Sequence, residues 1–232
     1  MSAPAIPPDR PLRLVGDVHG DVRGFSAACA TENFVIQLGD LVDYGPDSGA
    51  TLRMAFELLD SGRGMFLLGN HEWKLARALN GRAVRMDDTL SRTIDQLDPD
   101  LRARAARDLP RTPAWLRRDG MVLAHGGFHT AMMDQLPPDE IEKVDGVLSR
   151  ALYAEPTGRL QADGYPERSL RWVHRIPKGV TTYVGHDCRS RDGRPLTMRG
   201  QAGGTAVFLD TGAGKGGHLS WVDLPPHAHR LL

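Results

Sequence analysis

Short polar motifs follow several apolar runs of this sequence, and their side chains are of the types that bind divalent metal ions. The positions are Asp17, His19, Asp40, Asp43, Asn70, His71, His125, His186 and Asp210. Carboxylate, imidazole and amide oxygen, without thiolate, suit ions of intermediate hardness such as manganese, iron or zinc. The same set of donors argues against a structural zinc site. The residue types therefore predict a metal centre that can do chemistry.

The number and spacing of these donors favour two ions over one. Asp17 and His19, in a D-x-H pattern, can hold one ion from alternate positions of a turn, and Asp40 can bridge to the second. The second ion can be completed by Asn70, His125 and His186. Two ions roughly 3.5–4 Å apart would clamp a phosphoryl group and acidify a water, which then attacks as metal-bound hydroxide. We expect manganese, with iron, zinc, nickel or magnesium as alternatives.

The motif GNHE at residues 69–72 adds a proton donor to this set. His71, pointing away from the ions, is suited to protonate the departing oxygen as a general acid. Asp43 can accept a hydrogen bond from the other ring nitrogen and so favour the imidazolium. Glu72 can cap the following helix or bond a metal ligand, and we assign it no catalytic role.

Six apolar runs precede these motifs, as expected for buried strands that end at one edge of a sheet. They are residues 12–15, 34–38, 65–68, 121–124, 181–184 and 206–209. Residues 218–223 alternate like a half-exposed strand. Asp210, after the last run, is expected either to fix a ligand histidine by a hydrogen bond or to accept one from a loop amide.

Helical patterns between the first runs favour an α/β protein with βαβ units. They cover residues 48–60 and 72–79, and a third helix begins at Pro99 with Asp98 as its cap. We predict a single domain over residues 1–232, with a flexible tail at 1–11. Residues 80–112 and 145–178 have less strand signal and are expected to be insertions over the site.

The composition of the chain limits the classes of molecule that it is expected to bind. Lys plus Arg and Asp plus Glu both number 29, so no overall basic field attracts long nucleic acid or anionic membrane. The N-terminus lacks a signal-peptide pattern, no apolar run is long enough to span a membrane, and a cytoplasmic protein is expected. Cys29 and Cys188 are too few for a disulfide framework.

The motifs GDVHG, GDLVDYGP, GNHE and HGG, in this order, resemble those of the phosphoprotein phosphatase group of calcineurin-like metallophosphoesterases. The resemblance implies an αββα sandwich of two mixed sheets with a dinuclear metal site. It also implies that His71 and Asp43 form the acid pair. The metal ligands that it implies are Asp17, His19, Asp40, Asn70, His125 and His186.

One position departs from that family pattern. The family usually has arginine after the second Asp, where its guanidinium clamps the phosphate, whereas this chain has Tyr44. Tyrosine brings no charge and no bidentate fork. We therefore expect substrate to be bound by Tyr44, by Asn70 and by a second arginine. The candidates for that arginine are Arg168, Arg171, Arg175 and Arg189, of which Arg171 is preferred because its segment contributes such a residue in some relatives.

Longer segments around GNHE and GHD resemble the phosphatase module of bacterial polynucleotide kinase-phosphatase, and bacterial protein phosphatases and symmetrical diadenosine tetraphosphatases are also similar in motif. The resemblance implies hydrolysis of phosphomonoesters, with a phosphopeptide, a nucleotide or an RNA end as substrate. Phosphodiester cleavage and diadenosine tetraphosphate hydrolysis remain alternatives. In a different class, the tyrosine at position 44 allows a metal-binding scaffold without turnover.

Overall fold

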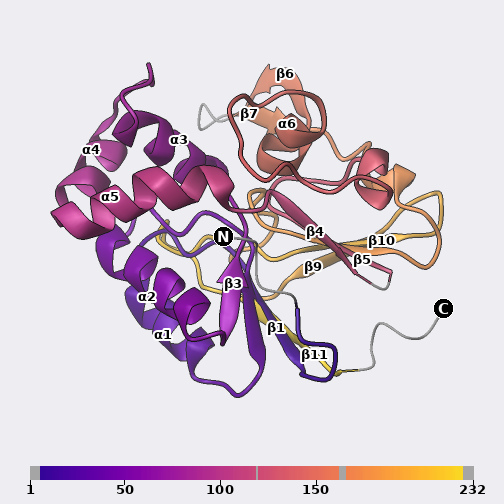
Figure 1. The fold of residues 1–232 in the computed structure, drawn as a ribbon. Coiled ribbons are helices and arrows are strands. Elements are labelled where there is room, and N and C mark those ends of the chain that lie inside the picture. The colour runs from indigo at the N-terminus through magenta and orange to yellow at the C-terminus, as the bar shows by residue number, and fades with distance from the viewer. Residues whose placement is uncertain (1–5, 119, 162–165, 227–232) are drawn as a thin grey trace.

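The computed structural model describes residues 6–118, 120–161 and 166–226. Within these residues two mixed sheets form the centre of the molecule (Figure 1). The first sheet has the order β11-β1-β2-β3, in which β1, β2 and β3 are parallel and β11 is antiparallel to β1. Its strands are β1 (Leu12–Val15), β2 (Phe34–Gln37), β3 (Gly64–Phe66) and β11 (Trp221–Leu224).

The second sheet has the order β4-β5-β8-β10-β9. Its three central strands are parallel, and β4 and β9 are antiparallel at the edges. Its strands are β4 (Trp115–Arg118), β5 (Met121–Ala124), β8 (Thr181–Val184), β9 (Leu196–Arg199) and β10 (Thr205–Phe208). A separate hairpin consists of β6 (Pro156–Leu160) and β7 (Pro166–Arg168).

Alternation along the strands makes the two sheets pack face to face. Leu12 and Leu14 of β1 belong to the same buried cluster as Met121 and Leu123 of β5. Because successive side chains of a strand point to opposite faces, the residues between them face outward, and Val122 packs in a second cluster with the helices. Both faces of each central strand are therefore buried, which explains why those runs are almost continuously apolar.

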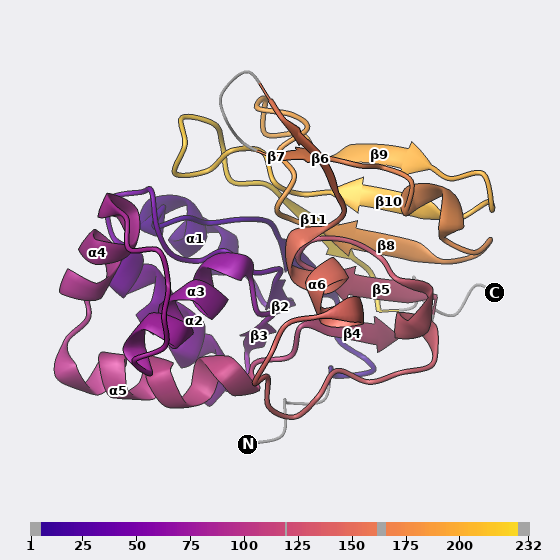
Figure 2. The same cartoon turned by 90° about the horizontal axis from the view of Figure 1, so that it is seen from above.

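Helices cover the outer faces and complete an αββα arrangement (Figure 2). They are α1 (Val22–Cys29), α2 (Ser48–Asp60), α3 (Asn70–Leu79), α4 (Asp88–Asp95), α5 (Pro99–Asp108) and α6 (Gly146–Tyr153). The first five gather beside the first sheet. On the outer face of the second sheet, Trp172 packs on Phe208 with ring centroids 5.7 Å apart. Short 3-10 turns lie at Leu109–Arg111, Thr130–Met133 and Val173–Arg175.

The predicted fold class is confirmed, and the elements missed are those with little apolar signal. Each of the six predicted apolar runs overlaps a strand, and the helix at 48–60 has the predicted ends. The helices α1 and α4 were not expected, because each buries only two side chains. The edge strand β9 was also missed, since none of its residues is fully buried.

The segment 80–112, predicted as an insertion, is helical and contains α4 and α5, and the segment 145–178, also predicted as one, contains α6 and the hairpin. Residues 1–5 of the predicted tail and 162–165 of the second insertion lie outside the described residues. The carbonyls of Ile6 and Pro7 accept hydrogen bonds from Arg118, so this part of the tail is packed. In the described residues no helix combines the length and apolarity that a membrane crossing requires.

Candidate metal centre

The carboxyl ends of five parallel strands deliver the predicted ligands to one place. Asp17 and His19 follow β1, Asp40 follows β2, and the segments after β3, β5 and β8 bring Asn70, His125 and His186. At the centre of this cluster lies one oxygen, Oδ2 of Asp40. It is 3.2 Å from Nε2 of His125, 3.7 Å from Nε2 of His19 and 3.8 Å from Nε2 of His71.

Two groups of donors within 4.8 Å of one another could each hold an ion. One group is Asp40 with His19 and His71, and the other is Asp40 with His125 and His186. Asp40 belongs to both groups, which is the position expected of a bridging carboxylate. Asn70 joins the second group, because its Oδ1 lies 3.0 Å from Nε2 of His125.

Backbone carbonyls orient two of these imidazoles toward the cluster. Nδ1 of His19 lies 2.9 Å from the carbonyl of Val42, and Nδ1 of His125 lies 3.0 Å from the carbonyl of Leu38. In neutral histidine this bond places the proton on Nδ1 and leaves the Nε2 lone pair facing the cluster. Nε2 of His19 is buried and has no hydrogen-bond partner. Such an atom fits a metal ligand, since a buried unpaired nitrogen is otherwise costly.

The buried carboxylates also fit a cation. Asp17 accepts the backbone N–H of His186 at 3.0 Å and lies 3.7 Å from Nε2 of His19. Burial, and then the neighbouring charge of Asp210, raise the pKa of Asp17 well above its ordinary value. Oδ2 of Asp210 is buried without a hydrogen-bond partner, while its Oδ1 accepts the N–H of Gly212 at 2.9 Å. Positive charge among these groups would remove their mutual repulsion.

The loops that carry the predicted ligands have strained backbones. Five of the six non-glycine residues with positive φ among the described residues lie in the predicted site, namely His19, Asp40, Asp43, Tyr44 and His186. Each left-handed residue costs of order 1 kcal/mol, which the packing around it must offset. Gly185 shows how close that packing is, because a Cβ there would lie 2.1 Å from Oδ1 of Asp17.

His71 and Asp43 form a pair beside this cluster. Nδ1 of His71 lies 2.6 Å from Oδ2 of Asp43, and the other oxygen of Asp43 accepts from Thr93 at 2.6 Å. Burial alone lowers the pKa of His71, but the charge of Asp40 and the hydrogen bond to Asp43 outweigh it and raise the pKa. The imidazolium needed by a general acid is therefore favoured.

The sequence model of one family, described as calcineurin-like phosphoesterase, matches residues 11–188. The chain belongs to this family. Its membership agrees with the phosphatase-type motifs, the two mixed sheets and the cluster of predicted ligands at the strand ends.

Curated relatives and a solved structure are similar over nearly the whole phosphoesterase. A symmetrical bis(5'-nucleosyl)-tetraphosphatase of Ralstonia nicotianae is 25% identical over 97% of this chain and 76% of its own. An asymmetrical bis(5'-nucleosyl)-tetraphosphatase of Geobacillus thermodenitrificans is 28% identical over 92% of this chain and 90% of its own. The crystal structure of a candidate diadenosine tetraphosphatase superposes with a TM-score of 0.60 at 20% identity, covering 93% of each chain. At that identity the structural likeness supports the fold alone.

Thr93 of the phosphoesterase was not singled out from the sequence. Its hydroxyl donates to Asp43 and lies 3.1 Å from the hydroxyl of Ser48, whose oxygen accepts the N–H of Asp43 at 2.8 Å. Asp87 caps α4 through the N–H of Leu90 and so holds the helix that carries Thr93. These contacts fix the carboxylate of Asp43 from the side opposite to His71.

Thr93→Val should lower kcat about tenfold, because the isosteric side chain removes one hydrogen bond to an ionised carboxylate. The alkaline limb of the kcat–pH profile should also shift, because a displaced Asp43 would change the pKa of His71. Steady-state kinetics over a range of pH measures both effects. Ser91→Ala, on the same helix, is the control and should leave kcat unchanged. An unchanged profile in Thr93→Val would mean that the hydroxyl does not position Asp43.

Glu72 anchors the loop that carries Asp40. Its two oxygens accept the backbone N–H groups of Gly69, Asp40, Leu41 and Val42 at 2.7–3.1 Å. The bond to Gly69 is the helix cap that the sequence suggested, and the bond to Asp40 is the suggested contact with a metal ligand. The bonds to Leu41 and Val42 were not foreseen. Burial and the charge of Asp40 raise the pKa of Glu72 to about 7, which again points to cations nearby.

The residues predicted to bind substrate differ in whether they contact the predicted ligands. Tyr44 packs edge-on against His19 and His71, with ring centroids 4.9 and 5.2 Å apart. Arg171 has a side chain that is 74% exposed, and its closest charged partner is Glu155 at 3.9 Å. Of the four candidate arginines, Arg168 contacts a predicted ligand, since its Nε lies 3.1 Å from Nε2 of His186. The geometry therefore favours Arg168 over Arg171.

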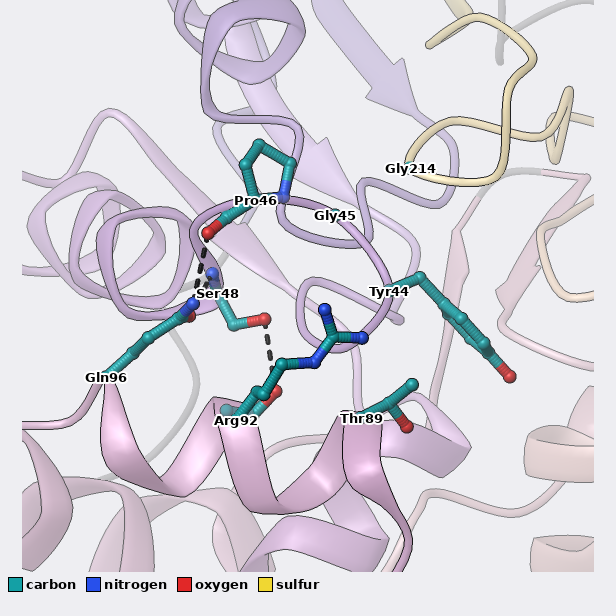
Figure 3. Close-up of a pocket in the computed structure, with 9 residues that line it drawn as sticks. Tyr44, Gly45, Pro46, Ser48, Thr89, Arg92, Gln96 and Gly214 are labelled. Atoms are coloured by element: carbon teal, nitrogen blue, oxygen red, sulfur yellow. Dashed lines mark hydrogen bonds between the residues drawn. The ribbon is translucent and has the colours of Figure 1, made fainter.

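A cavity of about 400 Å³ opens beside Tyr44. It is lined by the loop 44–46 and by α4, from which Arg92 rises toward the loop (Figure 3). Gln96 closes one wall by bonding the carbonyl of Pro46 at 3.0 Å and the N–H of Ser48 at 2.7 Å. The polar lining of this cavity suits the part of a substrate that extends away from the cluster of predicted ligands.

Proposed function

We propose that this phosphoesterase hydrolyses the polyphosphate chain of dinucleoside tetraphosphates. The observation that carries the proposal is the convergence of three imidazole nitrogens on Oδ2 of Asp40, next to the His71–Asp43 pair. That arrangement suits hydrolysis of a phosphorus–oxygen bond and needs no nucleophilic side chain.

Two divalent ions, manganese first, fit the donors described. We assign their ligands as Asp17, His19, Asp40, Asn70, His125 and His186. When bound, such ions polarise the phosphoryl oxygens and make water more acidic. Asp210 supports the site from outside the ligand set, through the loop that begins at Gly212.

The chain's own residues handle the departing oxygen. Nδ1 of His71 is occupied by Asp43, so its Nε2 is the atom that can deliver a proton. The side chain of His71 is 14% exposed, which leaves it partly accessible to solvent. Asp43, held by Thr93 and Ser48, keeps the ring oriented and the imidazolium favoured.

The choice of substrate rests on the relatives and on the space beside Tyr44. The relatives reported above are named as tetraphosphatases of both the symmetrical and the asymmetrical kind. The cavity lined by Tyr44, Arg92 and Gln96 offers a cation and hydrogen-bonding groups to a nucleoside phosphate. We also propose that the protein is cytoplasmic, where nucleotides are available, and that it forms no stable complex with long nucleic acid.

Metal-free protein should be inactive, and reloading with manganese should restore hydrolysis of diadenosine tetraphosphate. The reloaded protein is compared on that compound, a mononucleotide, a phosphoserine peptide, an RNA 3'-phosphate and a 2',3'-cyclic phosphate. The tetraphosphate should have the highest kcat/KM. Chromatography of the products identifies the bond cleaved, since a symmetrical cut yields two diphosphates and an asymmetrical cut yields a triphosphate and a monophosphate.

Asp40→Ala is the control in this experiment, because it removes the shared ligand of both donor groups. It should lose bound manganese and all hydrolysis together. If the phosphopeptide or the mononucleotide had the highest kcat/KM, the proposed substrate would be wrong while the phosphoesterase assignment stands.

A further inference from the structure

Lys215 lies beside the candidate site, in a loop that neither the ligand set nor the acid pair uses. Its Nζ is 4.6 Å from the centre of the Tyr44 ring, in a cation–π contact. Tyr44 in turn packs edge-on against both His19 and His71. The Tyr44 ring therefore contacts this ammonium group, one predicted ligand and the predicted acid.

The backbone around Lys215 is tied down. The N–H groups of Lys215 and Gly217 both donate to the carbonyl of Gly212, at 3.0 and 2.9 Å. Gly214 has a φ of +68°, and a Cβ there would lie 2.3 Å from the carbonyl oxygen of His19. The loop 212–217 is thus seated directly on the loop that carries His19, and the position of Lys215 is set by that contact.

Among the described residues no carboxylate forms an ion pair with Lys215, although Asp17 and Asp40 lie in the adjoining cluster. Lys215 is half-buried, and its ammonium group, which has no carboxylate partner among the described residues, is available to an anion.

We infer that Lys215, steadied by the ring of Tyr44, binds a phosphate group of the substrate. This inference rests on the proposed function and names the residue that supplies positive charge on the Tyr44 side. Arg168 provides a cation next to His186. Lysine acts as a point charge without a bidentate fork, so the aromatic face compensates by restricting a flexible side chain.

Titration calorimetry with inorganic phosphate on the manganese-loaded protein tests the inference without requiring turnover. Lys215→Met removes the charge and keeps the length of the side chain, and it should weaken phosphate binding about 10- to 100-fold. Lys215→Arg should remain within about threefold of the wild type. Lys143→Met, at a lysine that is 82% exposed, is the matched control and should bind like the wild type.

The role of the Tyr44 ring in steadying Lys215 is tested with a second pair of variants. Tyr44→Phe keeps the ring face, whereas Tyr44→Leu removes it, and both occupy the same left-handed backbone. The leucine variant should bind phosphate about 3- to 10-fold more weakly than the phenylalanine variant. Manganese content, measured on each variant, should stay at the wild-type value.

Phosphate binding that is unchanged in Lys215→Met would overturn the inference. So would a loss accompanied by loss of manganese, because that result assigns Lys215 to the integrity of the loop. The proposed function fails separately, if wild-type protein binds phosphate but leaves diadenosine tetraphosphate intact.

Discussion

His71→Asn should lower kcat on an alkyl phosphate by about 10²–10⁴-fold while the protein keeps its full manganese content. The reason is that His71 has one ring nitrogen on Asp43, at 2.6 Å, and the other free to protonate the departing oxygen. Steady-state kinetics and metal analysis of the same preparation measure the two quantities.

The leaving group provides the control for that result. The nitrophenolate of a nitrophenyl phosphate can leave without being protonated. Hydrolysis of that substrate should therefore be slowed much less by His71→Asn than hydrolysis of the alkyl phosphate. Because His71 also lies within 4.8 Å of the donors of His19 and Asp40, it could instead be a ligand. Equal losses on both substrates, together with lost manganese, would establish that alternative and remove the acid role.

Asp43→Asn adds a test by pH. A general acid must be protonated, so activity is lost as pH rises through its pKa. The hydrogen bond that His71 donates to Asp43 is one of the causes that raise the pKa of His71. Its replacement by a neutral amide should therefore move the alkaline limb of the kcat profile to lower pH. A limb that does not move would show that Asp43 does not set the protonation of His71.

Glu72→Ala should lower the free energy of unfolding by about 3–5 kcal/mol. The carboxylate accepts four buried backbone N–H groups, which no described side chain could otherwise satisfy in place. Three of these donors belong to residues 40–42, so the loop that carries Asp40 should lose its shape as well. Urea unfolding measures the first effect and manganese affinity the second.

Two variants accompany this measurement. Glu72→Gln keeps one acceptor oxygen and should show about half the loss. Glu57→Ala, on the exposed side of α2, should change stability by less than about 0.5 kcal/mol. If Glu72→Ala were as stable as the control variant, the four hydrogen bonds would not anchor the loop.

The framework of this protein could be read from the sequence because its signals are local. Each buried strand is a short apolar run that ends in glycine and polar residues, and the run and its motif are adjacent in the chain. The family resemblance and the ligand chemistry both led to the same positions. The elements that were missed, such as α1 and β9, have too few buried residues to stand out.

The residues that support the site were decided by tertiary structure. Thr93 meets Asp43 across 50 residues of sequence, and Glu72 reaches the N–H of Asp40 across 32. Lys215 comes to Tyr44 only because a glycine loop after β10 is seated on the loop after β1. A hydroxyl, a carboxylate and an ammonium group are common on any surface. Their roles depend on which buried atom they face, and that is set by the packing of the two sheets.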